Sequence, residues 1–435
     1  MSVHVAKIEI RNVKGFGEGE EGVDLDLTQG GAREDLAGWT VLAGPNGSGK
    51  TTVLQAVAMG IVDSRLYFSV ADQLVGWVRR GAWEAWLGLR FLPDHEEPPD
   101  SSPREVVEHH IDWSSEDRGG ELGAFPGDFF ASTEKQGGWF AAAYGSSRRV
   151  VGRIEEAGGD PANHPRRLAL MGLFRQDAYL AESVQWLKSL DYRALKADAS
   201  ARELRDGIIA LLNDGLLPGD VKIVGVDPDG LRVMSRGTEL LLQRLGDGYR
   251  TTAAFVVDLL MHMARVFSKR ALVEFRDGRP IVPHSGVVLV DEMELHLHPQ
   301  WQQKIGFWLK EHFPKVQFIV TTHSPFICQA ADTLVRLSPP GEGRTAAEIV
   351  DEETFRRVVG GGADDAVVSD LFGLPHPHSA EVEWARERLA SLEAKELRGN
   401  LTDAERGELA GLQNKLPYAP GASVERVLRK VAAAE

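Results

Sequence analysis

The stretch GPNGSGKT, from Gly44 to Thr51, decides the fold class of this 435-residue chain. It fits the pattern G-x-x-x-x-G-K-[ST], whose glycines allow backbone N–H groups to surround a phosphate. The apolar stretch GWTVLAG precedes it, and TTVLQAVAMGIV, which has the apolar spacing of a helix, follows it. A helix that begins at the loop adds the positive end of its dipole to the phosphate site. The stretch therefore predicts a site for ATP or GTP.

Each part of this loop has an expected contact with the nucleotide. Lys50 is expected to reach the β- and γ-phosphates, and the Thr51 hydroxyl to bind Mg²⁺. The residues expected to hold the nucleotide are Asn46, Gly47, Ser48, Gly49, Lys50, Thr51 and Thr52. The alternative interpretation is an ordinary glycine-rich loop before a helix, without a ligand.

A second stretch, GVVLVDEMELHLHPQWQQ, supplies the acids that such a loop requires. Its apolar run, Val287–Val290, is typical of a parallel strand that is buried on both faces. Asp291, at the carboxyl end of this run, is expected to bind Mg²⁺ through water, and Glu292 to polarise the attacking water. Because two adjacent acids exceed what one Mg²⁺ site requires, the pair predicts hydrolysis as well as binding. The choice of Met293 has no explanation in the sequence.

Three histidines lie near these acids and differ in their expected roles. His323 follows the strand pattern VQFIVTT, where a polar residue faces the γ-phosphate, so we predict a catalytic role; the alternative is a hydrogen-bonded loop residue. His296 and His298 could suggest a zinc site, but no further ligand pair stands nearby at the usual spacing. We interpret these two as part of a turn that faces a partner subunit.

Patterns elsewhere predict the remaining elements. HVAKIEIRNV alternates like a strand, with Ile8 and Ile10 on one face, and VKIVGV and LRVMSR form a hairpin around DPDG. TAAFVVDLLMHMARVFSKR predicts a long helix. Residues 93–140 are rich in Pro, Gly, Ser and acids and are expected to form surface loops. Two charged helices are predicted near the end, the second with a capping box from Thr402 to Glu405.

Composition and charge limit the classes of function. The chain is 43% apolar, has no apolar stretch near 18 residues, and contains one cysteine, Cys328, so we expect a cytoplasmic protein without a membrane span. Its net charge of −15 disfavours broad nucleic-acid binding. A local excess of arginine after Tyr144 could still contact DNA, although a solvated loop face is the alternative. The candidates for DNA contact are Arg148, Arg149, Arg166 and Arg167.

Four stretches, GPNGSGKTT, LGDGYRT, VVLVDEMELHLHP and TTHSP, occur in this order. Together they resemble the ABC-class P-loop ATPases of the RecF, SMC and overcoming-lysogenisation type. The resemblance implies ATP and Mg²⁺ as cofactors and an α/β fold: an ABC-type ATPase head with a mixed or parallel sheet core, a helical insertion and a helical C-terminal tail. The implied regions are an N-terminal ATPase lobe at 1–92, the insertion at 93–240, a C-terminal ATPase lobe at 241–345, and a tail at 346–435.

The resemblance gives LGDGYRT a role at a subunit interface. In this class the signature motif meets ATP that is bound by the other subunit, which implies nucleotide contacts for Gly246, Asp247 and Gly248. The family usually has serine where this chain has Gly246, so a hydroxyl contact to the γ-phosphate is missing. The class also has a glutamine between the first helix and the insertion, for which Gln55 and Gln73 are the candidates.

The stretches WVRRGAWEAWL, YGSSRR and LFGL and the short helical tail, on a chain without a long coiled coil, resemble compact bacterial anti-phage ATPases within this class, such as PtuA of Septu systems and its retron-associated relatives. The similarity implies head-to-tail homodimers or higher assemblies that control a separate nuclease or toxin. The tail, with Trp384, Leu389, Leu392 and Leu397, is expected to dock such an effector or to pack on its own core. The alternative function is a RecF-like repair ATPase that acts on DNA. A nuclease in the same chain is not expected, because the tail lacks a convincing spacing of metal-binding acids.

Overall fold

The computed structural model describes residues 3–28, 36–61, 76–93, 107–114, 139–148, 169–174, 181–217, 219–227, 230–268, 270–341, 345–374 and 378–416. The chain forms two units, Met1–Phe372 and Gly373–Glu435. The boundary thus falls after Phe372, whereas the sequence suggested that a tail begins at residue 346. β15, α10 and α11, which follow that position, belong to the first unit.

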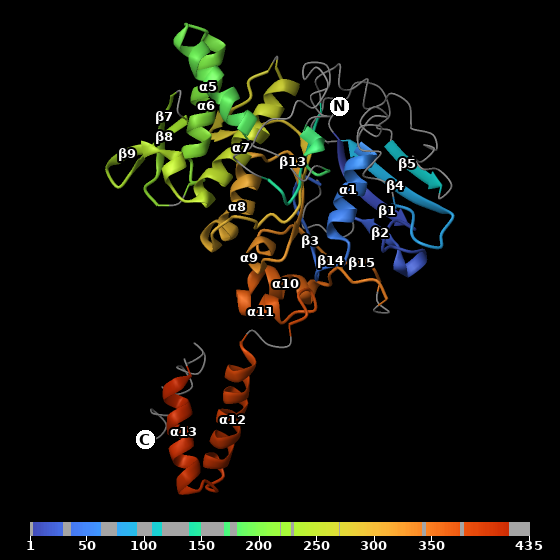
Figure 1. Cartoon of the computed structure of the whole chain (residues 1–435), viewed down its shortest axis with the longest axis vertical. Coiled ribbons are helices and arrows are strands. Elements are labelled where there is room, and N and C mark those ends of the chain that lie inside the picture. Colours follow the sequence, from blue (N-terminus) through green and yellow to red (C-terminus); the bar gives the residue numbers. More distant parts are fainter. Residues whose placement is uncertain are drawn as a thin grey trace. The chain divides into compact units, whose positions relative to one another are not determined.

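A six-stranded sheet forms the centre of the first unit, in the order β15-β14-β3-β13-β12-β6 (Figure 1). Its strands are β3 (Gly38–Ala43), β6 (Phe140–Tyr144), β12 (Gly286–Val290), β13 (Val316–Thr322), β14 (Thr333–Leu337) and β15 (Ala347–Ile349). All neighbours are parallel except β14 and β15. Every residue of β3, β6, β12 and β13 is buried, as the continuous apolar runs predict. The mixed-sheet α/β fold expected from the sequence is therefore confirmed.

A second, antiparallel sheet has the order β2-β1-β4-β5. Its strands are β1 (Val3–Arg11), β2 (Val23–Asp26), β4 (Glu84–Pro93) and β5 (Val107–Ser114). Ile8 and Ile10 share its buried face, as predicted. The prediction of surface loops across 93–140 is wrong for Val107–Ser114, which form the strand β5. Its buried positions alternate, but His109 occupies one of them beside Ile111, and this buried histidine hid the pattern.

Helix α1 (Lys50–Ile61) packs between the two sheets. Val53 and Leu54 lie in one apolar cluster with Ile8 of β1, Leu87 of β4 and Leu289 of β12. Gly60 allows the close contact with β4, because a Cβ there would lie 2.2 Å from Leu89 Cδ1. This packing fixes the start of α1 at the carboxyl ends of the central strands.

The other face of the central sheet is covered by helices and two small sheets, β7-β8-β9 and β10-β11 (Figure 1). The elements are α5 (Ala181–Leu195), α6 (Ala199–Asn213), β7 (Lys222–Asp227), β8 (Gly230–Ser235), β9 (Thr238–Leu241), α7 (Asp247–Val266), β10 (Glu274–Arg276), β11 (Arg279–Ile281), α8 (Pro299–His312), α9 (Pro325–Cys328), α10 (Glu352–Gly360) and α11 (Ala363–Val367). The predicted hairpin is β7–β8, and the predicted long helix is α7.

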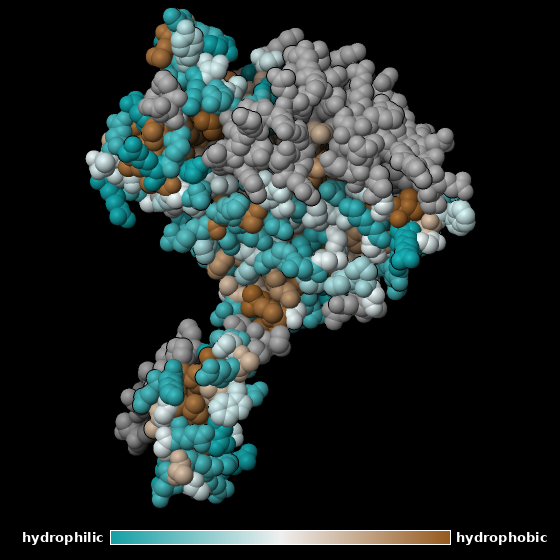
Figure 2. Space-filling model, viewed as in Figure 1, coloured by the Kyte–Doolittle hydropathy of each residue, from teal (hydrophilic) through white to brown (hydrophobic). Residues whose placement is uncertain are grey.

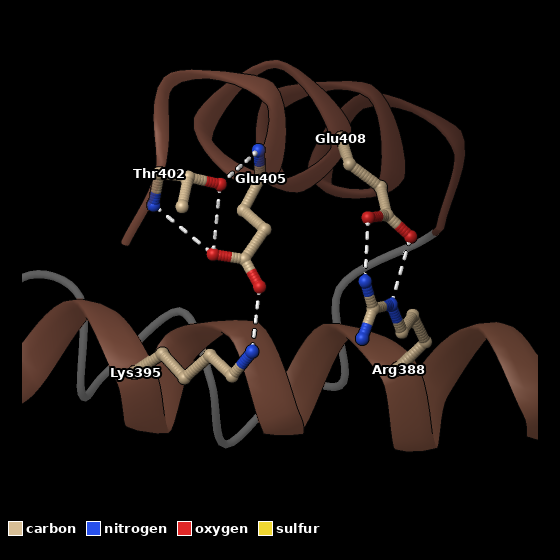
Figure 3. A network of polar contacts seen from close by, with 5 residues as sticks. All are labelled: Arg388, Lys395, Thr402, Glu405 and Glu408. Carbon is tan, nitrogen blue, oxygen red and sulfur yellow. Dashed lines mark hydrogen bonds and ion pairs between the residues drawn. The ribbon is translucent and has the colours of Figure 1, made fainter. Parts of the chain in front are cut away.

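The second unit contains a hairpin of two helices, α12 (Ala380–Leu397) and α13 (Asp403–Lys415). Its apolar contact consists of Leu392, Leu401 and Leu409. Figure 2 shows mainly hydrophilic residues around a hydrophobic strip on this unit. The predicted capping box is present: Thr402 Oγ1 accepts from Glu405 N, and Glu405 Oε2 from Thr402 N (Figure 3).

Candidate nucleotide-binding site

Glycines give the loop between β3 and α1 its shape. Gly44, Gly47 and Gly49 have φ angles of 157°, 82° and 87°, which other residues rarely adopt. A Cβ on Gly44 would lie 2.2 Å from the carbonyl oxygen of Leu337, and one on Gly49 would lie 2.4 Å from the Phe16 ring. The backbone of the loop can therefore pass close to its neighbours only because these residues lack side chains.

The polar groups of the loop fit a bound phosphate. Lys50 is buried, and its Nζ donates to the carbonyl oxygens of Gly44, at 2.8 Å, and Pro45, at 2.9 Å. Burial lowers the pKa of Lys50, while Asp291 and Glu292 nearby act in the opposite direction. Among the described residues, nothing makes a hydrogen bond to the buried Ser48 Oγ. A phosphate would give both groups a charged or polar partner.

The structure brings the two proposed Mg²⁺ ligands together. Asp291 lies at the carboxyl end of β12 and is 3% exposed. Its Oδ2 accepts a hydrogen bond from Thr51 Oγ1 at 2.9 Å, and its Oδ1 accepts one from Thr321 Oγ1 at 2.6 Å. One carboxylate and one hydroxyl at the edge of a phosphate loop match the oxygen ligands that Mg²⁺ takes beside a nucleotide.

Glu292 occupies an unusual backbone conformation. Its φ angle is 47°, in the left-handed region that non-glycine residues rarely adopt. Its N–H donates to Thr321 Oγ1 at 2.7 Å, and its half-buried side chain lines the same cavity as Lys50. Such conformations concentrate at functional sites, where neighbouring groups hold them in place.

His323 follows β13 and also lines this cavity. Burial, and then the positive charge of Lys50, lower the pKa of His323, so the ring is neutral at neutral pH. The backbone N–H of His323 donates to Glu294 Oε1 at 2.6 Å, and Thr322 Oγ1 donates to Glu294 Oε2 at 2.6 Å. Glu294 thus fixes the loop that carries His323. The sequence analysis missed it, although a third acid two positions after Glu292 was a visible signal.

The residues predicted from the phosphate loop and from the ends of β12 and β13 line one cavity of about 370 Å³. Its lining includes the phosphate loop from Asn46 to Thr52 together with Asp291, Glu292 and His323. Gly15, Phe16 and Pro340 also line it and were not predicted, because no motif marks them. They come from the loop after β1 and the segment after β14, so only the folded chain shows their position.

The signature residues lie at the start of α7 and do not line this cavity. Gly246 is the N-cap of α7, and both Gly246 and Asp247 are exposed. The backbone at Gly248 lies close to this chain's own Trp301, because a Cβ there would lie 2.4 Å from the Trp301 ring. Gly248 therefore has a packing role within the chain.

The position of Arg148 does not fit its predicted contact with DNA. Its guanidinium is buried, and it donates to backbone carbonyl oxygens instead of facing solvent. Arg149, Arg166 and Arg167 lie outside the described residues. The same holds for Gln73.

Gln55, the other glutamine candidate, lies on α1 and does not line the cavity. It accepts a hydrogen bond from Lys14 Nζ at 3.1 Å and donates to the Leu173 carbonyl oxygen at 3.5 Å. These contacts are made within the chain, so the geometry gives Gln55 no contact with the nucleotide site.

The stretch after the acids builds the start of α8. His298 is the N-cap, and its Nδ1 accepts from Gln300 N at 3.3 Å. Within the described part of the chain, no group of three or more His, Cys, Asp or Glu residues could hold a metal ion. Met293 is buried in the core, and its N–H donates to the Thr321 carbonyl oxygen at 3.0 Å, so an apolar residue is required there.

The chain is similar in sequence to AAA-domain families and to Septu and retron proteins. A family profile described as "AAA domain, putative AbiEii toxin, Type IV TA system" matches residues 163–329, and one described as "AAA domain" matches residues 7–67. Septu protein PtuA of Bacillus mycoides (strain KBAB4) is 24% identical over 74% of this chain and 38% of its own length. The retron Ec83 probable ATPase of Escherichia coli is 37% identical over 24% of this chain and 18% of its own length.

The chain has the α/β fold of a P-loop ATPase and is related to these Septu and retron proteins. Among solved structures, the SMC head domain from Thermotoga maritima has a TM-score of 0.42 and 16% identity, and the match covers 80% of this chain and 98% of that one. The chain spans only 18% to 38% of the length of the curated relatives it matches. No helix in the described ranges combines the length and apolar character that crossing a membrane requires.

Proposed function

We propose that the chain binds ATP with Mg²⁺ and hydrolyses it, and that this ATPase cycle controls a separate effector protein in bacterial anti-phage defence. The observation that carries hydrolysis is the convergence of Lys50, Thr51, Asp291 and Glu292 on one cavity. The defence context is supported by the relatives, which are named as Septu and retron proteins. We place this activity in the cytoplasm.

The chain's own residues provide a route for hydrolysis. Lys50 exchanges the carbonyl oxygens of its loop for the β- and γ-phosphates. Mg²⁺, held by Thr51 and Asp291, supplies positive charge beside these phosphates when it is bound. Glu292 accepts a proton from water while the water oxygen attacks the γ-phosphorus and the bond to the ADP oxygen breaks. The His323 ring, which is neutral at neutral pH, orients the γ-phosphate by a hydrogen bond.

The exposed signature turn supports a head-to-tail homodimer, or a higher assembly built from it. Gly246 and Asp247 are exposed at the N-terminus of α7 and do not line their own chain's cavity. A helix N-terminus favours negative charge, so this turn would suit the phosphates of ATP bound by a second copy. The second unit, where Trp384 and Leu397 are 63% and 74% exposed, is our candidate for effector docking.

Hydrolysis is tested with the full chain, Mg²⁺ and ATP. We expect Lys50→Ala to abolish ATP binding, because it removes the charge that meets the β- and γ-phosphates. Glu292→Gln should bind ATP normally but hydrolyse it on the order of a hundredfold more slowly, as for loss of a general base. It should also accumulate an ATP-bound dimer, detectable by light scattering.

The matched control is Glu239→Gln, the same change at a surface position on β9. It should leave turnover unchanged. Equal turnover in Glu292→Gln and the unaltered chain would remove Glu292 from the mechanism, and normal ATP binding by Lys50→Ala would reject the site itself.

A further inference from the structure

Arg148 is a buried cation whose described partners are backbone carbonyl oxygens. It lies four residues after the end of β6 and is 4% exposed. Its Nη1 donates to the carbonyl oxygens of Gly145, at 3.0 Å, and Asp291, at 2.6 Å, and its Nη2 donates to that of Glu292, at 2.9 Å. Two of these three carbonyls belong to the proposed Mg²⁺ ligand Asp291 and the proposed general base Glu292, although the hydrogen bonds do not involve their carboxylates.

Burial of this charge is costly unless the surroundings compensate it. Burial lowers the pKa of Arg148 to about 10, while the nearby carboxylates of Asp291, Glu294 and Glu292 act in the opposite direction. The guanidinium therefore stays charged at neutral pH. Its planar fork donates from two nitrogens in a fixed geometry, whereas the three N–H groups of a lysine all lie on a single nitrogen.

The contacts of Arg148 complete a clamp around the Cα of Glu292. The peptide unit before this Cα has its carbonyl, Asp291 O, held by Arg148 and its N–H held by Thr321 Oγ1 at 2.7 Å. The unit after it has its carbonyl, Glu292 O, held by Arg148 and its N–H, that of Met293, held by the Thr321 carbonyl at 3.0 Å. Both peptide units are thus fixed from both sides.

The order of the strands explains why two groups, one on each side of β12, hold these peptide units. β12, which carries the acids, lies between β13 and β6 in the sheet. Thr321 belongs to β13, and Arg148 follows β6, so each neighbouring strand supplies one side. Between them Glu292 keeps a φ of 47°, a left-handed conformation that a non-glycine residue would leave without such support.

We propose that Arg148 is a positioning residue that fixes the backbone of Glu292 so that its carboxylate points at the attacking water. The proposal rests on the proposed ATPase function. Because a shift of about 1 Å in a catalytic group can reduce a rate about a hundredfold, loss of the clamp should lower turnover strongly. ATP binding should change little, since Arg148 does not line the nucleotide cavity.

The test compares Arg148→Lys with the unaltered full chain. Lysine keeps the charge but lacks the fork, so we expect kcat to fall tenfold to a hundredfold, with the Kd for ATP changed less than about threefold. Arg205→Lys is the matched control, because Arg205 on α6 pairs with Asp191 and Asp206 away from the cavity. Thermal unfolding of each variant shows whether it is folded. If Arg148→Lys does not fold, Arg148→Gln takes its place in the same measurements.

A double substitution separates positioning from general structural damage. If Arg148 acts through Glu292, Arg148→Lys should cost little further turnover in a Glu292→Gln background. Additive losses, an unchanged kcat, or a Kd for ATP that rises in step with the fall in kcat would overturn the proposal.

Amide hydrogen exchange decides the same question without ATP. Arg148→Lys should speed exchange at Glu292 and Met293 at least tenfold, while amides at the centre of β13 keep their protection. Unchanged exchange at these two amides would overturn the positioning role. Absence of ATP turnover in the unaltered chain would instead reject the proposed function, so the two failures are distinguishable.

Discussion

Gly246 leaves the N-terminus of α7 without a side-chain cap. Its φ of −61° and ψ of 158° are open to any residue, and a Cβ there would meet nothing within 4 Å. Serine at an N-cap accepts a hydrogen bond from a backbone N–H in the first turn. The same hydroxyl would also provide the contact that signature motifs of this class usually offer to the γ-phosphate.

We therefore predict a gain from Gly246→Ser. The helix cap should add a few tenths of a kcal/mol to the free energy of unfolding. In a Glu292→Gln background, the proposed ATP-dependent dimer should form at lower protein concentration, as measured by light scattering. Gly246→Ala is the control, since it adds a Cβ without an oxygen. Equal dimerisation by the serine and alanine variants would show that the hydroxyl makes no contact across the interface.

Motif spacing alone could place the residues that we propose to contact the nucleotide directly. Lys50 and Thr51 lie together because they are adjacent on one helix turn, and Asp291 because it ends a buried strand. The supporting contacts depend on which strands are neighbours. Thr321 and Arg148 reach Glu292 only because β12 lies between β13 and β6, and no local pattern encodes that order.

At the scale of elements, long apolar patterns were informative and short polar ones were not. α7 and β12 follow directly from their periodicity. β15 has three residues and only one of them is buried, so its pairing with β14 has no signal in the sequence. This pairing continues the central sheet past residue 346, which explains why the first unit extends beyond the expected end of the ATPase lobe.

The α12–α13 hairpin contains polar contacts, shown in Figure 3, and an apolar contact at Leu392, and the two kinds can be ranked. Arg388 forms two hydrogen bonds of 2.8 Å with the Glu408 carboxylate, but both side chains are about one-third exposed. Ion pairs at such exposed positions contribute little to stability, because solvent screens the two charges. Leu392 is fully buried between the helices, and truncation of a buried leucine costs about 2–5 kcal/mol. The leucine should therefore dominate the stability of the hairpin.

This ranking predicts different results for Leu392→Ala and Arg388→Ala. Leu392→Ala should speed amide exchange across both helices, whereas Arg388→Ala should change it less than about fivefold. Leu397→Ala is the control for the loss of a leucine, because Leu397 is 74% exposed. A larger effect from Arg388→Ala than from Leu392→Ala would show that the ion pair holds the helices together.

At the scale of the whole molecule, a buried polar cluster joins the central sheet to the helical layer. Tyr144 ends β6, and its hydroxyl donates to Asp258 Oδ2 on α7 at 3.0 Å. His262 Nε2 lies 3.4 Å from the same oxygen. Burial raises the pKa of Asp258 to about 7 and lowers the pKa of His262 to about 3. Both groups therefore stay neutral in the folded chain over a wide range of pH.

The two pKa shifts make the free energy of unfolding depend on pH in opposite directions. The unfolded chain loses the Asp258 proton near pH 3.8 while the folded chain keeps it to about pH 7, so this contribution falls as pH rises between those values. Unfolded His262 gains a proton below about pH 6.5 while the folded ring stays neutral. Its contribution therefore falls as pH drops from 6.5 towards 3.

Asp258→Asn should isolate the first contribution, because asparagine can still accept from Tyr144 but does not ionise. Relative to this variant, the unaltered chain should lose roughly 1 kcal/mol of unfolding free energy per pH unit between pH 5 and pH 7, with no further relative loss above about pH 8. Urea titrations at a series of pH values measure the difference, and Asp206→Asn, at an exposed site, is the control. Parallel stability curves for the unaltered chain and Asp258→Asn would mean that Asp258 is ionised in the folded protein, and that its charge is stabilised by groups which burial alone does not reveal.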